Sequence, residues 1–401
     1  RVQQGAYQLI AVEKLAQMHH RVGQRLLDLP AAEQEEKLFD IVRHLNLGRP
    51  QVTTDEEREQ LVAWNLKAGR RAARSAAYPQ ARDFFEQGLA QLGDQAWSDR
   101  YELVHEFYCQ LCNVTMLLAD MKALGGYFEA TVEHARSPLE QVPPYLSLID
   151  AHMAAGDTRA AVAASLEILG RLGFDFSGPR LSPAQLRSEV EQARGERSIE
   201  SLQALQENQD PVSRAALELM VKTLAPAYVG APDLFPELAV RAVCLCLEHG
   251  HSPGSCYALA TYGVLLAGLF IQPHEARQWG ELAMHSLQRG DQTRYAPGAT
   301  YVYHVHIRVW TDPLESVLES NPTTYRLALR SGDRSFAAFS ILMRIQHGFF
   351  SGRALERLVS ECRPYLDICA QLAPVVGVCA RASFQMLLGL QGQGEVPQSL
   401  S

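Results

Sequence analysis

The stretch SAAYPQARDFFEQGLAQLG, residues 75–93, decides the fold. Its small and aromatic residues recur at intervals of three and four, which places Tyr78, Ala81, Phe85 and Gly88 on one face of a helix. The preceding segment, which contains AGRRAA, has the same helical period. A helix with such an anchor face is either one buried helix of an enzyme or one copy of a repeated unit.

The spacing of this anchor face recurs in three later segments. LADMKALGGYFEATVEHA places Leu124 and Phe128 at the offsets of Ala81 and Phe85. AGDTRAAVAASLEILGRLG places Ala161 there, and IQPHEARQWGELAMHSLQRG is a fourth candidate. Ala81, Leu124 and Ala161 are 43 and then 37 residues apart, near the period of helix-pair repeats. The stretch is therefore interpreted as a repeat unit.

Repeats of this kind predict how their helices pack. Small anchors such as Gly69, Ala81 and Gly88 let the second helix of a hairpin lie close to the first, while aromatic anchors such as Phe85 fill the space between units. Nearly every other segment also has helical periodicity. The predicted fold is all-α, a tetratricopeptide-like superhelical array of antiparallel helix hairpins, or α-solenoid. The segment YVYHVHIRVW, 301–310, alternates like a strand, but its helical neighbours favour a buried helix.

Changes in composition along the chain predict its organisation. Residues 1–50 form a helical preface, and 51–180 form a first tetratricopeptide-like sub-array. Polar sequence rich in glycine and proline then predicts inserted or connecting helices over 181–225. A second sub-array follows over 226–395, opening with PAYVGAPDLFPE as an inter-helix turn, and 396–401 form a frayed tail.

Composition limits the function classes. A net charge of −8 and a pI near 5.9 argue against nucleic-acid binding, which usually shows a basic excess. The longest apolar run, 256–271, is interrupted and too short to span a membrane, so no membrane insertion is expected. The eight cysteines lie scattered in helical patterns, which predicts reduced thiols in a cytoplasmic protein. With no signal peptide and no initiator methionine, the sequence is expected to be a piece of a longer chain.

No motif in the sequence predicts catalysis, a cofactor or a metal site. None of the lysines follows a glycine, as the lysine of a phosphate-binding loop does. GHSPG, 250–254, matches the G-x-S-x-G elbow of hydrolases, but it follows a helix, and Pro253 has no N–H for an oxyanion hole. It is therefore interpreted as an inter-helix turn.

Cysteine and histidine residues are dense in one segment, but their spacing does not favour a metal. Cys244 and Cys246 point about 200° apart on a helix, so they cannot share one zinc ion. Buried cysteines acting as small apolar residues are the favoured interpretation, also for Cys109 and Cys112. His304 and His306 are interpreted as ordinary core or surface histidines.

One charged feature is a candidate binding site. Lys67, Arg70, Arg71 and Arg74 lie on one helix, the first helix of the clearest repeat. If the repeat stacks as tetratricopeptides do, Arg70 and Arg74 face the concave groove, where such arrays hold acidic peptide ends. The alternative interpretation is an ordinary solvated face.

Several stretches resemble one kind of bacterial signalling protein. They are RVQQGAYQLI at the start, HHRVGQRLL, EEKLFDIVRHLNLG, QLVAWNLKAGRRAARSAAYPQARDFFEQGL, LGFDFSGP, RSIESL and HGHSPGSCYALATYGVLLAG. Proteins of this family are giant chains with a serine/threonine-kinase-like domain, an AAA-type signal-transduction ATPase module and a long helical repeat region. GAF or PAS sensor domains and a histidine kinase often follow. The family's segment DRVQQAAY lies just after the ATPase, so the resemblance implies that an ATPase module precedes this chain.

The resemblance implies a non-catalytic regulatory or scaffold region. Its partner would be a protein, a neighbouring domain of the same parent chain or a small-molecule effector, and no catalytic residue of the family falls within these residues. Two alternatives remain. The chain could be the effector-binding domain of an ATPase-linked transcription regulator, or an all-helical enzyme without a short motif. A helix-turn-helix encoded downstream would indicate the first, and a buried pair of titratable residues in a closed pocket would indicate the second.

Overall fold

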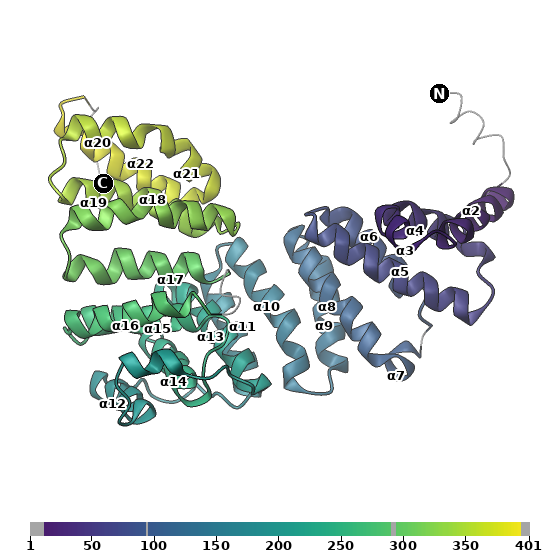
Figure 1. Cartoon of the computed structure of the whole chain (residues 1–401), viewed down its shortest axis with the longest axis horizontal. Coiled ribbons are helices and arrows are strands. Elements are labelled where there is room, and N and C mark those ends of the chain that lie inside the picture. Colours follow the sequence, from purple (N-terminus) through teal and green to yellow (C-terminus); the bar gives the residue numbers. More distant parts are fainter. Residues whose placement is uncertain (1–11, 94, 290–293, 394–401) are drawn as a thin grey trace. The chain divides into compact units, whose positions relative to one another are not determined.

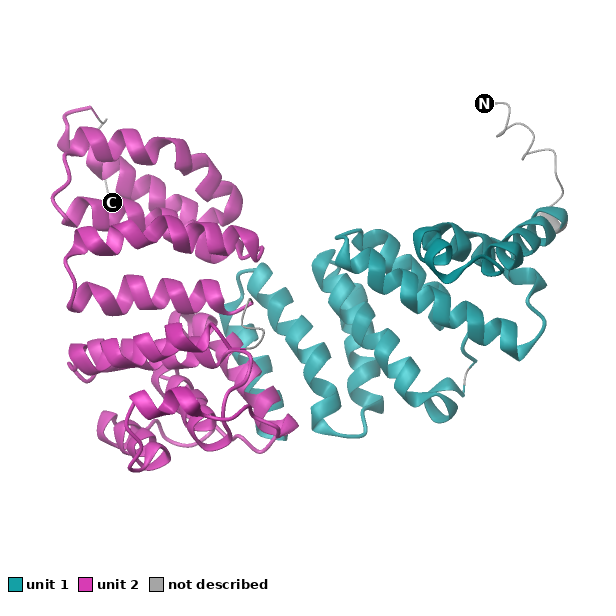
Figure 2. Cartoon of the chain, in the orientation of Figure 1, with its two compact units in different colours: residues 1–171 teal, residues 172–401 magenta. Residues whose placement is uncertain are grey.

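The computed structural model describes residues 12–93, 95–289 and 294–393, and all of its named elements are helices (Figure 1). Within these ranges there is no strand, only an isolated bridge between Glu207 and His251. The predicted all-α class is confirmed. The predicted tail, 396–401, and the first eleven residues lie outside the described part. The chain divides into two compact units, 1–171 and 172–401 (Figure 2).

The first unit consists of a helical preface followed by three helix hairpins. α5 packs against α6, α8 against α9 and α10 against α11, while α6 and α10 both pack against α8. In the preface, α4 packs against α2 and α5. The elements are α2 Val12–Leu27, α3 Ala31–Glu36, α4 Leu38–Leu47, η1 Arg49–Gln51, α5 Asp55–Arg74, α6 Tyr78–Leu89, α7 Ala96–Asp99, α8 Tyr101–Leu117, α9 Met121–His134, α10 Pro138–Ala154 and α11 Thr158–Arg171.

The second unit is also built of neighbouring helix pairs. The pairs are α13 with α14, α15 with α16, α18 with α19, and α21 with α22. The elements are α12 Pro183–Arg194, η2 Glu200–Ala204, α13 Pro211–Gly230, α14 Phe235–His249, α15 Ser255–Gly268, α16 Pro273–Ser286, α17 Ala296–Val302, the π-helical η3 Tyr303–Ile307, η4 Arg308–Trp310, α18 Leu314–Arg330, α19 Arg334–Phe350, α20 Leu355–Cys362, η5 Arg363–Tyr365, α21 Leu366–Leu372 and α22 Pro374–Leu390.

Two predictions about local structure in the second unit can be compared with the structure. Residues 301–310 are helical, as favoured over a strand, although the helix widens to π geometry at η3. The inter-helix turn predicted over 226–237 is present but shorter, and it covers residues 231–234 between α13 and α14. α13 continues through Pro226 to Gly230, so the expected boundary between 225 and 226 falls inside a helix. The buried neighbours Leu224 and Ala227 keep this turn helical although Pro226 donates no hydrogen bond.

The same tight turn closes several of the hairpins. One residue takes a left-handed conformation, and the next residue donates its N–H to the carbonyl five residues earlier, as in a Schellman motif. The left-handed residues are Ala76, Ala119, Gly156, Gly332 and Gly352. The donors and acceptors are Ala77 to Ala72, Asp120 to Thr115, Asp157 to His152, Asp333 to Ala328, and Arg353 to Gly348. In three of these turns the donor is an aspartate whose carboxylate also caps the next helix: Asp120, Asp157 and Asp333.

The anchor residues lie between the helices of the first unit. Ala81, Phe85, Leu124 and Ala161 are fully buried. Tyr78 and Phe128 are half-buried at the edges of neighbouring core clusters. Gly69 and Gly88 are buried where aromatic rings cross them: a Cβ on Gly69 would lie 2.4 Å from the Phe85 ring, and one on Gly88 would lie 2.7 Å from the Phe107 ring.

Alanine substitutions at Gly69 and Gly126 should change the free energy of unfolding in opposite directions. Replacing Gly69 with alanine should lower the free energy of unfolding by about 1–3 kcal/mol, because the new methyl group would overpack the Phe85 ring. Replacing Gly126 should instead raise it by roughly 0.5–1 kcal/mol, because a Cβ there meets nothing and alanine favours helix. Urea unfolding of the two variants measures both. Stabilisation by both substitutions would show that α5 and α6 do not approach this closely.

Candidate functional site: the basic face of α5 and the groove beside it

The four cations predicted as a stripe lie on α5, and three of them form ion pairs with two neighbouring helices. Lys67 Nζ is 2.6 Å from a Glu35 carboxylate oxygen, and Arg71 is 3.6 Å from the other. The hydrogen bond from Lys67 lowers the pKa of Glu35, so this α3 carboxylate stays ionised. On the other side, Arg70 pairs with Glu106 of α8. Arg74 is exposed near the end of the helix.

These ion pairs change the interpretation of the stripe. Lys67, Arg70 and Arg71 already hold carboxylates of the chain itself, so they are less available to an acidic partner than the sequence indicated. Exposed pairs of this kind contribute little to stability, roughly 0–1 kcal/mol each, and a ligand carboxylate could compete for them. The stripe is therefore the edge of a site rather than the site itself.

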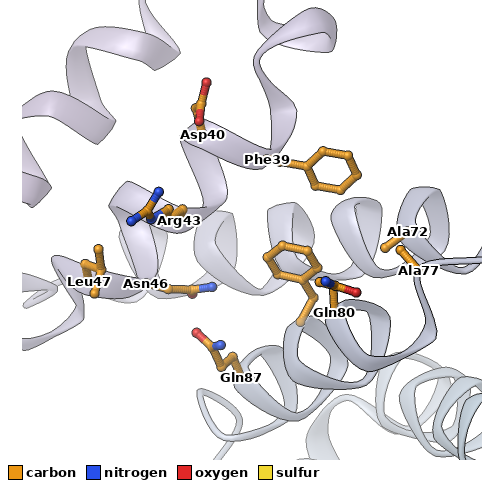
Figure 3. A pocket seen from close by; sticks show the side chains of 10 residues that line it. Phe39, Asp40, Arg43, Asn46, Leu47, Ala72, Ala77, Gln80 and Gln87 are labelled. Atoms are coloured by element: carbon orange, nitrogen blue, oxygen red, sulfur yellow. The ribbon is translucent and has the colours of Figure 1, made fainter. Parts of the chain in front are cut away.

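A groove opens beside this face, between α4 and α6 (Figure 3). Its volume is about 630 Å³. The floor comes from α5 and the turn after it, and the walls come from α4 and α6. The lining residues are Phe39, Asp40, Arg43, Asn46 and Leu47 on α4, Ala72 on α5, Ala77 in the turn, and Gln80, Phe84 and Gln87 on α6.

An aromatic pair joins the two walls of the groove. The rings of Phe39 and Phe84 are stacked, with centroids 5.8 Å apart and planes 13° from parallel. The Arg71 guanidinium lies 5.6 Å from the centroid of the Phe39 ring, so the basic face and the groove share a border. Phe39 is 39% exposed, which is unusual for a phenylalanine that only fills a core. The pair offers an apolar surface next to a delocalised positive charge.

A buried amide pair sets the position of α4 above α5. Asn46 donates to the Asn65 side-chain oxygen at 2.9 Å, and Asn65 donates back at 2.8 Å. Asn65 is fully buried and also donates to the carbonyl of Leu61. Because each amide both donates a hydrogen bond to the other and accepts one from it, this pair fixes the position of α4 at the floor of the groove.

Besides Asn46, the groove is lined by the Asp40 carboxylate and by three polar side chains that are available to a ligand. Arg43, Gln80 and Gln87 line it, and within the described residues their side chains make no hydrogen bond or ion pair. Side-chain amides match the donors and acceptors of a peptide backbone, and a guanidinium matches a carboxylate. The groove is thus chemically suited to a peptide segment with an apolar residue and an acidic group. The sequence showed no signal for it beyond an exposed phenylalanine in an otherwise amphipathic helix.

The G-x-S-x-G match is an inter-helix turn, as predicted. α14 ends at His249, and the turn passes through Gly250 and Gly254, whose φ angles are 100° and 96°. Ser252 is buried at 3% exposure, and its N–H donates to the Ser255 hydroxyl at 2.9 Å. A nucleophile elbow instead presents its serine at the end of a strand.

The predicted cysteines are buried or half-buried thiols. Burial raises the pKa of Cys109, Cys112, Cys244 and Cys246 to about 12, so these thiols stay protonated at neutral pH. Within the described ranges, no three histidine, cysteine or acidic side chains are placed to hold one metal ion.

His304 and His306 lie in the π-helical segment η3 of the second unit. Burial lowers the pKa of each to about 4, with Arg308 adding to the effect at His304 and His347 at His306. Arg308 donates to His304 Nδ1 at 3.0 Å and also binds Asp312, Ser316 and Ser320. This network ties η3 to α18, which gives it a structural role.

Comparisons with known proteins give one informative match. No protein-family model matches the chain. Over 365 residues, 83% of this chain, it is 18% identical to a hybrid signal transduction histidine kinase G of Dictyostelium discoideum. The aligned part covers 11% of that protein, so the chain spans about a tenth of the length of the relative it matches. No helix among the described residues has the length and hydropathy needed to cross a membrane. The relative that the chain matches is a signal-transduction protein.

Proposed function

We propose that this chain is a non-catalytic regulatory and scaffold region of a multi-domain, cytoplasmic signal-transduction kinase associated with an ATPase module. The observation that carries the proposal is the collinear match of 83% of the chain to part of a hybrid histidine kinase. The helix hairpins add support, because stacked hairpins present long surfaces whose usual task is binding.

The groove between α4 and α6 is the proposed binding site. It takes a segment of a partner protein or of a neighbouring domain, with an apolar side chain on the Phe39 and Phe84 rings and a carboxylate on Arg43. A segment wedged between α4 and α6 would have to strain the Asn46–Asn65 pair, which joins α4 to α5, and would thereby shift the preface against the hairpins. Such a shift is how binding is relayed to the adjoining domains.

The first test is the mass of the native protein in source cells, detected with an antibody raised against residues 56–175. We expect a band far above 44.5 kDa, with kinase activity in the immunoprecipitate. A band near 44.5 kDa, or a large band without kinase activity, would overturn the proposal.

The groove is tested in the native full-length chain by Arg43→Glu. We expect the autophosphorylation rate to change by about fivefold or more, the scale of a typical coupling free energy between sites. The matched control is Arg330→Glu, the same charge reversal at an exposed position at the end of α18. Equal rates in both variants and the native chain would remove the groove from the proposal.

A further inference from the structure

The last described helix, α22, has two apolar faces, and only one of them is covered by residues that the structure describes. Its inner face packs against α19, α20 and α21 and includes the buried residues Val376, Ala380, Phe384 and Leu387. Its outer face also carries large apolar side chains. The exposed fractions are 78% for Val375, 68% for Val378, 46% for Met386 and 57% for Leu390.

The outer residues form one continuous stripe. Val375, Val378, Ala382, Met386 and Leu390 follow one another at intervals of three or four, so they share a face over the whole helix. An isolated exposed valine needs no explanation, but an apolar stripe along a whole helix indicates a contact surface.

The surroundings of the stripe restrict what covers it. α22 contains a single charged residue, Arg381, whose guanidinium is 2.8 Å from the carboxylate of Asp367 on α21. The pair lies beside the stripe, so the stripe itself carries no charge. A strongly acidic or basic partner would find no complementary group on it, whereas a second apolar helix would lose nothing by burying it.

We propose that α22 pairs with α22 of a second copy of this chain, antiparallel, about a two-fold axis at Ala382. The stripe is complementary to itself about that point. Four residues separate Ala382 from Val378 on one side and from Met386 on the other, and Val375 and Leu390 lie seven and eight residues away. In the antiparallel pair, Val378 therefore faces the partner's Met386, and Val375 faces the partner's Leu390. The small side chain of Ala382 lets the helices approach at the centre.

The size of the surface predicts a reversible dimer. The exposed parts of the stripe on two copies sum to on the order of 1,000 Å², which is below the range of stable interfaces and typical of weak, transient ones. The dimer should therefore form in the micromolar concentration range and dissociate on dilution. This inference does not depend on the proposed function of the groove.

Sedimentation equilibrium of the 401-residue protein tests the pairing. Between about 1 µM and about 100 µM, the average mass should rise from 44.5 kDa toward twice that value. Val378→Glu and Met386→Lys should each keep the protein monomeric, because a charge would be buried against an apolar side chain. The double variant should dimerise again, because residues 378 and 386 face each other across the axis.

A control variant separates this face from general surface effects. Phe350→Glu changes a side chain that is 73% exposed at the end of α19, and it should dimerise like the unmodified protein. Circular dichroism shows whether each variant keeps its helix content. Three results would overturn the proposal: a monomer at every concentration, a dimer unaffected by the single substitutions, or a double variant that stays monomeric although folded.

Discussion

Replacing Phe85 with alanine should lower the free energy of unfolding of the first unit by about 3–5 kcal/mol, the usual cost of removing a fully buried phenylalanine ring. The ring is completely buried, lies directly over Gly69 and meets the Phe107 ring edge-on, with centroids 6.2 Å apart. Gly69 and Phe107 lie on α5 and α8, which are held in place by other helices as well. The space left by the ring would therefore collapse only in part.

Urea unfolding followed by hydrogen exchange in peptides from α5 and α8 measures this loss. The control is Phe350→Ala, where the ring is 73% exposed and the change should stay within about 0.5 kcal/mol. Phe85→Ala should also remove the penalty of Gly69→Ala, because the added methyl group would enter the vacated space. The two effects should therefore not add. Strict additivity would mean that the ring does not lie over Gly69.

Lowering the pH from 7 toward 4 should destabilise the second unit by several kcal/mol. His304 and His306 have pKa values lowered to about 4 by burial, against 6.5 for the ordinary side chain. The unfolded chain therefore binds protons at these sites at a higher pH than the folded chain does. The stability they provide is complete above pH 6.5 and is lost as the pH falls from 6.5 to 4, by on the order of 3 kcal/mol for each histidine. At His304, protonation of Nδ1 would also abolish its acceptance of the Arg308 hydrogen bond.

The slope of the unfolding free energy against pH measures how many more protons the unfolded chain binds than the folded chain. His306→Phe should reduce that slope by about one proton between pH 4 and 6.5, as read by hydrogen exchange in peptides from α17 and α18. Tyr301→Phe, a change in a ring beside His306, should leave the slope unchanged because burial raises the pKa of the Tyr301 hydroxyl far above this range. The same slope in the His306 variant and the unmodified protein would contradict the lowered pKa of His306.

The hairpins were predictable because their signals are local. Small and aromatic residues at helical spacing, as in the segments with Ala81, Leu124 and Ala161, determine which faces are buried. The sequence contains a further copy of this turn: SGDRSF, 331–336, matches AGDTRA, 155–160, in its left-handed glycine and in the capping aspartate that follows. The end of α13 differs from the prediction because proline usually interrupts a helix, whereas the buried apolar residues around Pro226 keep this turn helical.

The groove could not be predicted in the same way. It depends on the distance between α4 and α6, which are 31 residues apart in sequence and touch mainly through the Phe39 and Phe84 rings. The ion pairs of α5 are also non-local, since Glu35 and Glu106 come from helices on either side. A sequence shows that Lys67 and Arg70 share a helix, but not which carboxylates reach them.

Because the same turn closes successive hairpins, the chain can be shortened or lengthened by one whole hairpin at a time. Ala76 and Ala119 occupy the same place in two successive turns, and Phe85 and Phe128 each follow nine residues later. Excising residues 76–118 would join α5 directly to α9 through an unchanged turn, with Phe128 taking the place of Phe85 above Gly69. A deletion of another length would rotate the anchor face out of register. Related chains can therefore gain or lose hairpins by recombination at these turns while the packing on each side is preserved.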